Sequence, residues 1–275
     1  MLATITWSVS PEIISFGPIH IRWYGLLFAT SFIIGFKIME WIYKKEKKNL
    51  DDLNDLIWYM ILGTVIGARL GHVLFYNPGY YLSHPIEILM VWKGGLASHG
   101  AAIGILTAIY LYSKKKKDQS FLYVMDRIVI TVALAAFFIR TGNLFNSEII
   151  GKPTDLPWGF IFTRVDNIPR HPTQLYEAFS YLASFFVLLS VYKKHDGKFK
   201  EGLLFGIFLI WIFGFRIFVE YFKENQSAFE QGMVLNMGQI LSIPLVIFGL
   251  YLLFRKPKAV PVKVSHRKKN HPKRS

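Results

Sequence analysis

Seven long stretches of mainly apolar residues alternate with short polar stretches along the chain. They cover residues 18–43, 54–76, 86–113, 121–143, 174–192, 202–222 and 238–254. About 20 apolar residues cross the hydrocarbon core of a bilayer as a helix, and each stretch is of roughly that length. The pattern predicts an all-α, polytopic integral membrane protein with about seven transmembrane helices and irregular segments between some of them. The third stretch contains Gly94, Gly95, Gly100 and Gly104, so we expect it to be broken or partly re-entrant.

Lysine and arginine are concentrated in alternate loops. One set of loops and the end of the chain hold 21 of them: Lys44, Lys45, Lys47, Lys48, Lys114–Lys117, Lys193, Lys194, Lys198, Lys200 and nine after Leu253. The opposite set holds four, Lys152, Arg164, Arg170 and Lys223. Cytoplasmic loops carry the basic excess, so we expect the N-terminus outside and the C-terminus in the cytoplasm.

The net charge of +14 changes this picture little. A basic excess can indicate a nucleic-acid partner, but here its one-sided placement favours membrane topology, so we expect membrane lipids and no nucleic acid as partners. Zero cysteines exclude an enzyme thiol nucleophile and a thiolate metal site. We expect residues 1–255 to form a transmembrane catalytic domain and residues 256–275 a disordered, basic cytoplasmic tail.

Five ionisable residues inside the apolar stretches fall at one depth, in the outer half of the bilayer, when each helix is counted at about 1.5 Å per residue. They are Arg69, His99, Arg140, Glu177 and Arg216. Charge at this depth is costly and indicates function. Arginine forks suit phosphate oxygens, and a histidine can take a proton near neutral pH. The residues alone therefore predict a lipid-phosphate site compatible with proton transfer. No metal is expected, because His99 and His171 lack a third ligand nearby.

The segment from Arg140 to Gly151 is the most unusual part of the sequence. Arg140, Asn143 and Asn146 follow one another at one helical turn, and Glu148 comes next, so they form a strip of hydrogen-bonding groups. Helix termination is the alternative, with asparagine and glycine as caps and Glu148 neutralising Arg140.

This segment resembles the signature of the prolipoprotein diacylglyceryl transferase family, Gly-Arg-x-Gly-Asn-Phe-x-Asn-x-Glu-x-x-Gly. It matches at Arg140, Gly142, Asn143, Asn146, Glu148 and Gly151, and departs at Ile139 and Leu144. Other family-like blocks follow in order: Trp23-Tyr24-Gly25, Gly67-Ala-Arg69-Leu-Gly71, Gly94-Gly95-Leu-Ala-Ser-His99-Gly100, His171-Pro-Thr-Gln-Leu-Tyr-Glu177, Phe215-Arg216 with Glu220, and Met237-Gly-Gln239. Ile212 stands where the family often has tyrosine, and Ala101 where it has glycine.

The resemblance implies a transferase of the bacterial plasma (inner) membrane. It would move the sn-1,2-diacylglyceryl group of phosphatidylglycerol to the lipobox cysteine of a prolipoprotein signal peptide and release glycerol phosphate, without a cofactor. The irregular segments would be periplasmic, and the site would open toward the outer leaflet. The resemblance gives catalytic roles to His99, Arg140 and Arg216. Phosphatidylglycerol would be bound by Tyr24, Arg69, Arg140, Asn143, Asn146, Glu148, Gly151, His171, Glu177 and Arg216.

Each candidate also has a structural alternative. Tyr24 fits an interfacial aromatic belt, Arg69 a charge that snorkels from a helix end, and His99 a buried core histidine. Arg216 and Glu220 are spaced to pair with each other, and the block from His171 to Glu177 fits a helix cap. Arg140 itself could lower the pKa of the substrate thiol and so replace His99.

A different class of function stays open as well. The arginines could line the path of a lipid or anion transporter. Transporters often show internal repeats and acidic coupling residues near the midplane, and the sequence has neither feature.

Overall fold

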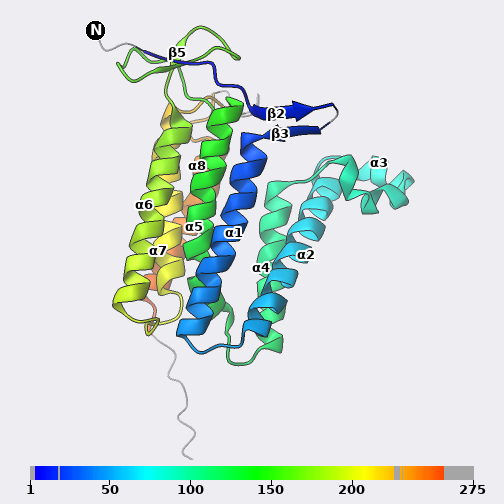
Figure 1. Ribbon diagram of the computed structural model, residues 1–275, viewed down its shortest axis with the longest axis vertical. Helices are drawn as coiled ribbons and strands as arrows, with labels where there is room; N and C mark the ends of the chain where they lie inside the picture. The colour runs from blue at the N-terminus through cyan, green and yellow to red at the C-terminus, as the bar shows by residue number, and fades with distance from the viewer. Residues whose placement is uncertain (1–3, 18, 226–229, 231, 257–275) are drawn as a thin grey trace, which may run out of the picture.

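The computed structural model describes residues 4–17, 19–225, 230 and 232–256, so the expected tail lies outside the described residues except for Lys256. Six helices of the described part are long and apolar enough to cross a membrane (Figure 1). They are α1 (Trp23–Lys45), α2 (Leu50–Phe75), α5 (Phe121–Asn146), α6 (Thr173–Lys194), α7 (Leu203–Val219, continued by the 3-10 turn η3, Glu220–Phe222) and α8 (Met237–Phe254). The predicted all-helical membrane fold is therefore confirmed.

The third predicted stretch is broken, as its glycines indicate. A short helix α3 (Pro78–Ser83) and the 3-10 turns η1 (Pro85–Leu89) and η2 (Val91–Lys93) precede the helix α4 (Ser98–Lys115). Gly94 and Gly95 have φ angles of +84° and +72°, which glycine adopts without steric cost. The chain therefore turns there, and α4 together with the six helices named above gives the expected number of about seven.

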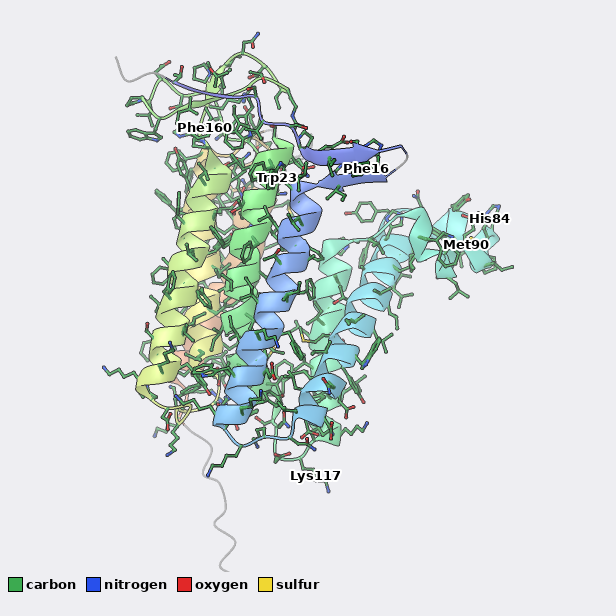
Figure 2. The ribbon with its side chains drawn as sticks, in the orientation of Figure 1. Phe16, Trp23, His84, Met90, Lys117 and Phe160 are labelled. Atoms are coloured by element: carbon green, nitrogen blue, oxygen red, sulfur yellow. The ribbon has the colours of Figure 1, made fainter. Side chains whose placement is uncertain are left out.

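The helices form two groups (Figure 1). Helices α1, α5, α6, α7 and α8 make a bundle, and α2 and α4 form a pair beside it, with α2 leaning away from α1. The loops rich in lysine gather at one end, where Figure 2 labels Lys117. We call this the lysine end. The strands lie at the opposite end, near Phe16, Trp23 and Phe160, and we call it the sheet end.

Helices α2 and α4 touch through glycine. A Cβ atom built on Gly104 would lie 2.1 Å from the carbonyl oxygen of Gly63, and one built on Gly67 would lie 2.4 Å from that of Gly100. Glycines four residues apart let helix backbones approach this closely in membranes. The pair is thus held by contact between backbones, with no side chains between these positions.

The pair joins the bundle mainly at the lysine end, where tyrosines are buried. Tyr43 of α1 and Tyr112 of α4 both donate to the side-chain oxygen of Gln119, each at 2.8 Å. The amide nitrogen of Gln119 donates to Asp52 of α2 at 2.9 Å. Buried hydroxyls need such partners. One glutamine therefore connects three helices.

Two small sheets cover the sheet end. Strand β1 (Ile5–Trp7) pairs in parallel with β4 (Phe160–Phe162), which pairs antiparallel with β5 (Pro169–Arg170). Strands β2 (Glu12–Phe16) and β3 (Ile19–Arg22) form an antiparallel hairpin that projects from the bundle (Figure 1).

The hairpin corrects one predicted boundary, because the first apolar stretch was expected to be helical from residue 18. Ile19, His20, Ile21 and Arg22 alternate in polarity, which is the period of a strand. His20 and Arg22 both face Glu12 across the hairpin, at 3.2 and 3.5 Å. Helix α1 consequently begins at Trp23.

Candidate active site

Arg140 lies near the end of α5, at the sheet end. Its Nε is 3.0 Å from Oε2 of Glu177 in α6, and its Nη1 donates to Oδ1 of Asn143 at 3.3 Å. The Glu177 side chain is fully buried, whereas 17% of the Arg140 side chain is exposed. Arg140 is thus paired with a glutamate from the next helix, and not with Glu148 as the helix-termination alternative has it.

The second oxygen of Glu177 faces a buried lysine. Its Oε1 accepts from Lys223 Nζ and from the Tyr181 hydroxyl, both at 3.0 Å. Lys223 also donates to Oε1 of Glu220 at 3.1 Å, and that atom lies 3.4 Å from Nε of Arg216. Five charged side chains are therefore linked in the order Arg140, Glu177, Lys223, Glu220 and Arg216. We call this series the ion-pair chain.

Arg216 forms the more open end of the ion-pair chain, with 36% of its side chain exposed. Its partner Glu220 is buried and accepts a further hydrogen bond from Nδ2 of Asn236 at 3.0 Å. The expected pairing of Arg216 with Glu220 is present. It uses Nε at a long distance, which leaves much of the guanidinium at the surface of the site.

Glu148 continues the site beyond Arg140. Its two carboxylate oxygens accept from the side-chain amides of Asn143 at 3.1 Å and Asn146 at 3.3 Å. Asn143 thus contacts Arg140 with its oxygen and Glu148 with its nitrogen. The predicted strip of hydrogen-bonding groups is present as connected side chains.

The backbone around Glu148 is strained. Ser147 and Ile149 have φ angles of +53° and +57°, a region that a β-branched residue rarely adopts. Two side chains from the start of α6 hold this conformation: Gln174 donates to the carbonyl of Glu148 at 2.7 Å, and Thr173 to that of Ile149 at 2.9 Å. Strain of this kind concentrates at functional sites.

Tyr24 stands over the same helix, in the first turn of α1. A Cβ atom on Gly142 would lie 2.7 Å from Cδ2 of the Tyr24 ring. The ring is half-buried and packs directly on the α5 backbone at Gly142. Gly142 lies between Arg140 and Asn143 in sequence and one helical turn before Asn146. Glycine at position 142 is therefore what admits the tyrosine to the site.

Gly151 and His171 form a junction of three chain segments. The amide of Gly151 donates to the carbonyl of His171 at 3.0 Å, and a Cβ at Gly151 would lie 2.8 Å from the carbonyl oxygen of Phe222. The His171 ring is 3.2 Å from the Tyr176 hydroxyl, and burial lowers its pKa. The junction fixes the backbone next to Lys223.

Pro172 precedes α6 without a side-chain cap. The capping alternative for the block from His171 to Glu177 therefore does not describe the structure.

Arg69 lies in the α2–α4 pair and is only 3% exposed. Its guanidinium donates to the backbone carbonyls of Glu87, of Ile88 at 2.9 Å, and of Gly94 at 2.6 Å. The ring of Tyr81 lies 4.9 Å from its Cζ. Arg69 therefore holds the segment before α4 in place, and it is not a charge that snorkels to the surface.

His99 is the second residue of α4, on the same pair, and is exposed. Its ring packs on Phe75, at the end of α2, and on Tyr76 just after it, with centroids 5.3 and 5.9 Å away. The core-histidine alternative therefore does not hold. Within the described part of the chain, no contact joins His99 or Arg69 to the ion-pair chain. The structure thus places them at the same end as the other candidates but in a separate group.

Lys223 was missed as a site residue, since the sequence treats it as a loop charge. Its spacing offers a signal, because Arg216, Glu220 and Lys223 recur at four and three residues, on one side of a helix. Tyr181 offers a similar signal, because it follows Glu177 at four residues on α6, whereas Asn236 lies beyond the reach of such spacing. Among the described residues, no group of three His, Asp or Glu side chains could hold a metal ion.

The fold and the site define a multi-pass membrane protein that gathers partly exposed arginines and buried carboxylates at one end of its helical bundle. The sequence model of a family described as prolipoprotein diacylglyceryl transferase matches residues 11–255. The chain belongs to this family.

Several relatives are similar over nearly their whole length. Proteins named phosphatidylglycerol–prolipoprotein diacylglyceryl transferase are 53% identical in Chloroherpeton thalassium, over 92% of this chain and 95% of the relative, and 48% identical in Tolumonas auensis, over 92% and 97%. The protein of the same name in Bacteroides fragilis is 44% identical, over 96% of this chain and 99% of the relative.

Proposed function

We propose that this chain transfers the diacylglyceryl group of phosphatidylglycerol to the lipobox cysteine of prolipoproteins. Family membership and the names of its relatives support a transferase with these two substrates. The ion-pair chain is the observation that carries the proposal. Glu177, Glu220 and Lys223 are charged side chains that are costly to bury in a membrane protein, and the two arginines paired with the glutamates suit a phosphate.

The reaction makes two demands on the protein. The cysteine thiol must lose a proton, and its sulfur then forms a bond to the glyceryl carbon that carries the phosphate. The bond between that carbon and the phosphate oxygen breaks, and its electron pair leaves with glycerol phosphate. The site must therefore accept a proton and stabilise negative charge that grows on a phosphate.

We assign the phosphate to Arg140 and Arg216. Both arginines remain partly exposed at the surface of the site, and each pairs with a buried glutamate, Glu177 for Arg140 and Glu220 for Arg216. Arginine can donate two parallel hydrogen bonds to phosphate oxygens, and a buried setting strengthens each of them.

We assign the proton to His99. His99 lies in the first turn of α4, and its exposed ring packs on Phe75 and Tyr76, so a substrate thiol can approach it from outside the pair. A thiolate stabilised by Arg140 is the alternative to this base.

The remaining predicted residues would shape the headgroup site. Tyr24, Asn143, Asn146 and Glu148 offer a hydroxyl, amides and a carboxylate of the kind that glycerol hydroxyls bind. Glu177 would orient Arg140. Backbone geometry would be maintained by three further residues. Gly151 and His171 would hold the junction near Lys223, and Arg69 would hold the segment before α4.

The proposal includes an orientation in a bacterial plasma (inner) membrane. The lysine end would lie in the cytoplasm and the sheet end in the periplasm, because cytoplasmic loops carry the basic excess. The site would then face the outer leaflet, where a secreted prolipoprotein emerges.

Purified protein in vesicles containing phosphatidylglycerol and a lipobox peptide tests the proposal. We expect a thioether-linked diacylglyceryl peptide and one glycerol phosphate for each peptide modified, both measured by mass spectrometry. A peptide with serine in place of cysteine is the control and should give neither product. Lipid movement across the vesicle without any thioether would favour the transporter instead.

A further inference from the structure

Lys223 occupies the middle of the ion-pair chain, and 2% of it is exposed. Its Nζ lies 3.0 Å from an oxygen of Glu177 and 3.1 Å from an oxygen of Glu220. Both glutamates also pair with an arginine. An ammonium buried this deeply is costly unless it is paired, and two carboxylates meet that need.

Lys223 reduces the extent to which each glutamate neutralises its arginine. Glu177 divides its carboxylate between Arg140, through Oε2, and Lys223, through Oε1. Glu220 presents the same oxygen to Lys223 and, at the longer distance of 3.4 Å, to Arg216. Neither glutamate therefore neutralises its arginine alone.

Charge counting within the ion-pair chain leads to the same point. Arg140, Arg216 and Lys223 are three cations against the two carboxylates of Glu177 and Glu220, which leaves one positive charge in excess. Glu148 is linked to Arg140 through the side-chain amide of Asn143. One excess positive charge matches the single negative charge of a phosphodiester.

We propose that Lys223 is a positioning residue, which holds Glu177 and Glu220 and so leaves Arg140 and Arg216 only partly neutralised and oriented for a phosphodiester headgroup. The inference rests on the proposed function, since phosphatidylglycerol supplies that headgroup. Without the lysine, each glutamate would be left to its arginine, and the site would lose its excess positive charge.

The test compares three substitutions at one position in the full-length protein. Lys223→Gln keeps an NH₂ group that can donate to carboxylates but removes the charge, Lys223→Met removes both, and Lys223→Arg keeps both. We expect the KM for phosphatidylglycerol to rise about 10–100-fold in the first two, the value of a lost interaction with a charged group. Lys223→Arg should stay within a few-fold of wild type.

Lys152→Met is the matched control. Lys152 lies at the same end and its ammonium donates to the carbonyl of Tyr221 at 2.9 Å, but it is exposed. We expect an unchanged KM for this variant. The folded fraction of every variant is measured by gel filtration and thermal unfolding in detergent.

A structural role would give a different pattern. A fall in kcat with an unchanged KM in both neutral variants would overturn the proposal, as would equal losses in Lys223→Arg and Lys223→Met. Failure of both neutral variants to fold would assign Lys223 to the stability of the bundle and would also overturn it. Binding of phosphatidylglycerol, measured without the peptide, separates this test from the proposed function. Wild-type protein that binds the lipid but forms no thioether would count against the transferase and leave the Lys223 comparison intact.

Discussion

Arg140 and Glu177 form an ion pair between neighbouring helices, with Nε and Oε2 3.0 Å apart. Nη1 of the same guanidinium donates to Asn143, and 17% of the Arg140 side chain is exposed. Under the proposed function, the ion pair with the buried carboxylate would orient the arginine for a phosphate.

Lysine should not replace either arginine of the site. Arg140→Lys and Arg216→Lys keep a positive charge but lose the planar fork. We expect kcat/KM for phosphatidylglycerol to fall about 100-fold or more, which corresponds to roughly 3 kcal/mol of transition-state stabilisation. Arg22→Lys, on the exposed hairpin, is the control and should keep normal turnover. Near-normal rates in both site variants would assign the two arginines to structure alone.

His99→Gln tests the proposed base. If His99 takes the thiol proton, the variant should slow transfer by about 10²–10⁴-fold, since glutamine keeps hydrogen bonding but cannot accept a proton at neutral pH. The deficit should shrink as the pH approaches the thiol's own pKa of about 8.5, because thiolate then forms without help. The measurement is the ratio of wild-type to variant rate between about pH 6.5 and 9. A flat ratio would remove His99 from the chemistry and favour thiol activation by Arg140.

The glycine contact between α2 and α4 predicts a local stability effect. Gly104→Ala would place a Cβ atom 2.1 Å from the Gly63 carbonyl, so the helices must separate at a cost of about 1–3 kcal/mol. Gly214→Ala is the matched control, because a Cβ there has no neighbour within 4 Å. We expect a lower Tm in detergent for the first variant and an unchanged or slightly higher one for the second. Equal Tm values would mean that the two helices do not pack in this way.

The basic loops predict the orientation of the chain. A reporter that is active only in the cytoplasm should work when fused after Lys117, between α4 and α5. The same reporter inserted after Asp155, in the segment between α5 and α6, should be silent. The reverse result would invert the protein and place the ion-pair chain near the inner leaflet.

Much of the architecture follows from the sequence, because the length of an apolar stretch is enough to predict a membrane helix. The runs place α1, α2 and α5 to α8, and Gly94 and Gly95 mark the break before α4. The first boundary was wrong because the apolar residues of β3 adjoin those of α1, and only their alternation separates strand from helix.

The candidate site was predictable in part. The segment from Arg140 to Glu148 supplies contacts within a few residues, and spacing along a helix reveals these. Its other partners come from helix packing, which spacing does not encode. The sequence alone therefore offered Glu148 as a partner of Arg140 only in the helix-termination alternative and named no partner on another helix, although Glu177 of α6 takes that place. Arg69 illustrates the same limit, since its partners are backbone carbonyls, which every residue carries.

The glycines of α2 and α4 also bear on how these two helices would move. Because the two backbones touch, we expect these helices to move as one rigid unit. Gln119 connects this unit to α1 at the lysine end, and His99 and Arg69 lie toward its other end. A tilt of the unit about Gln119 would therefore displace the histidine together with the whole segment that Arg69 holds.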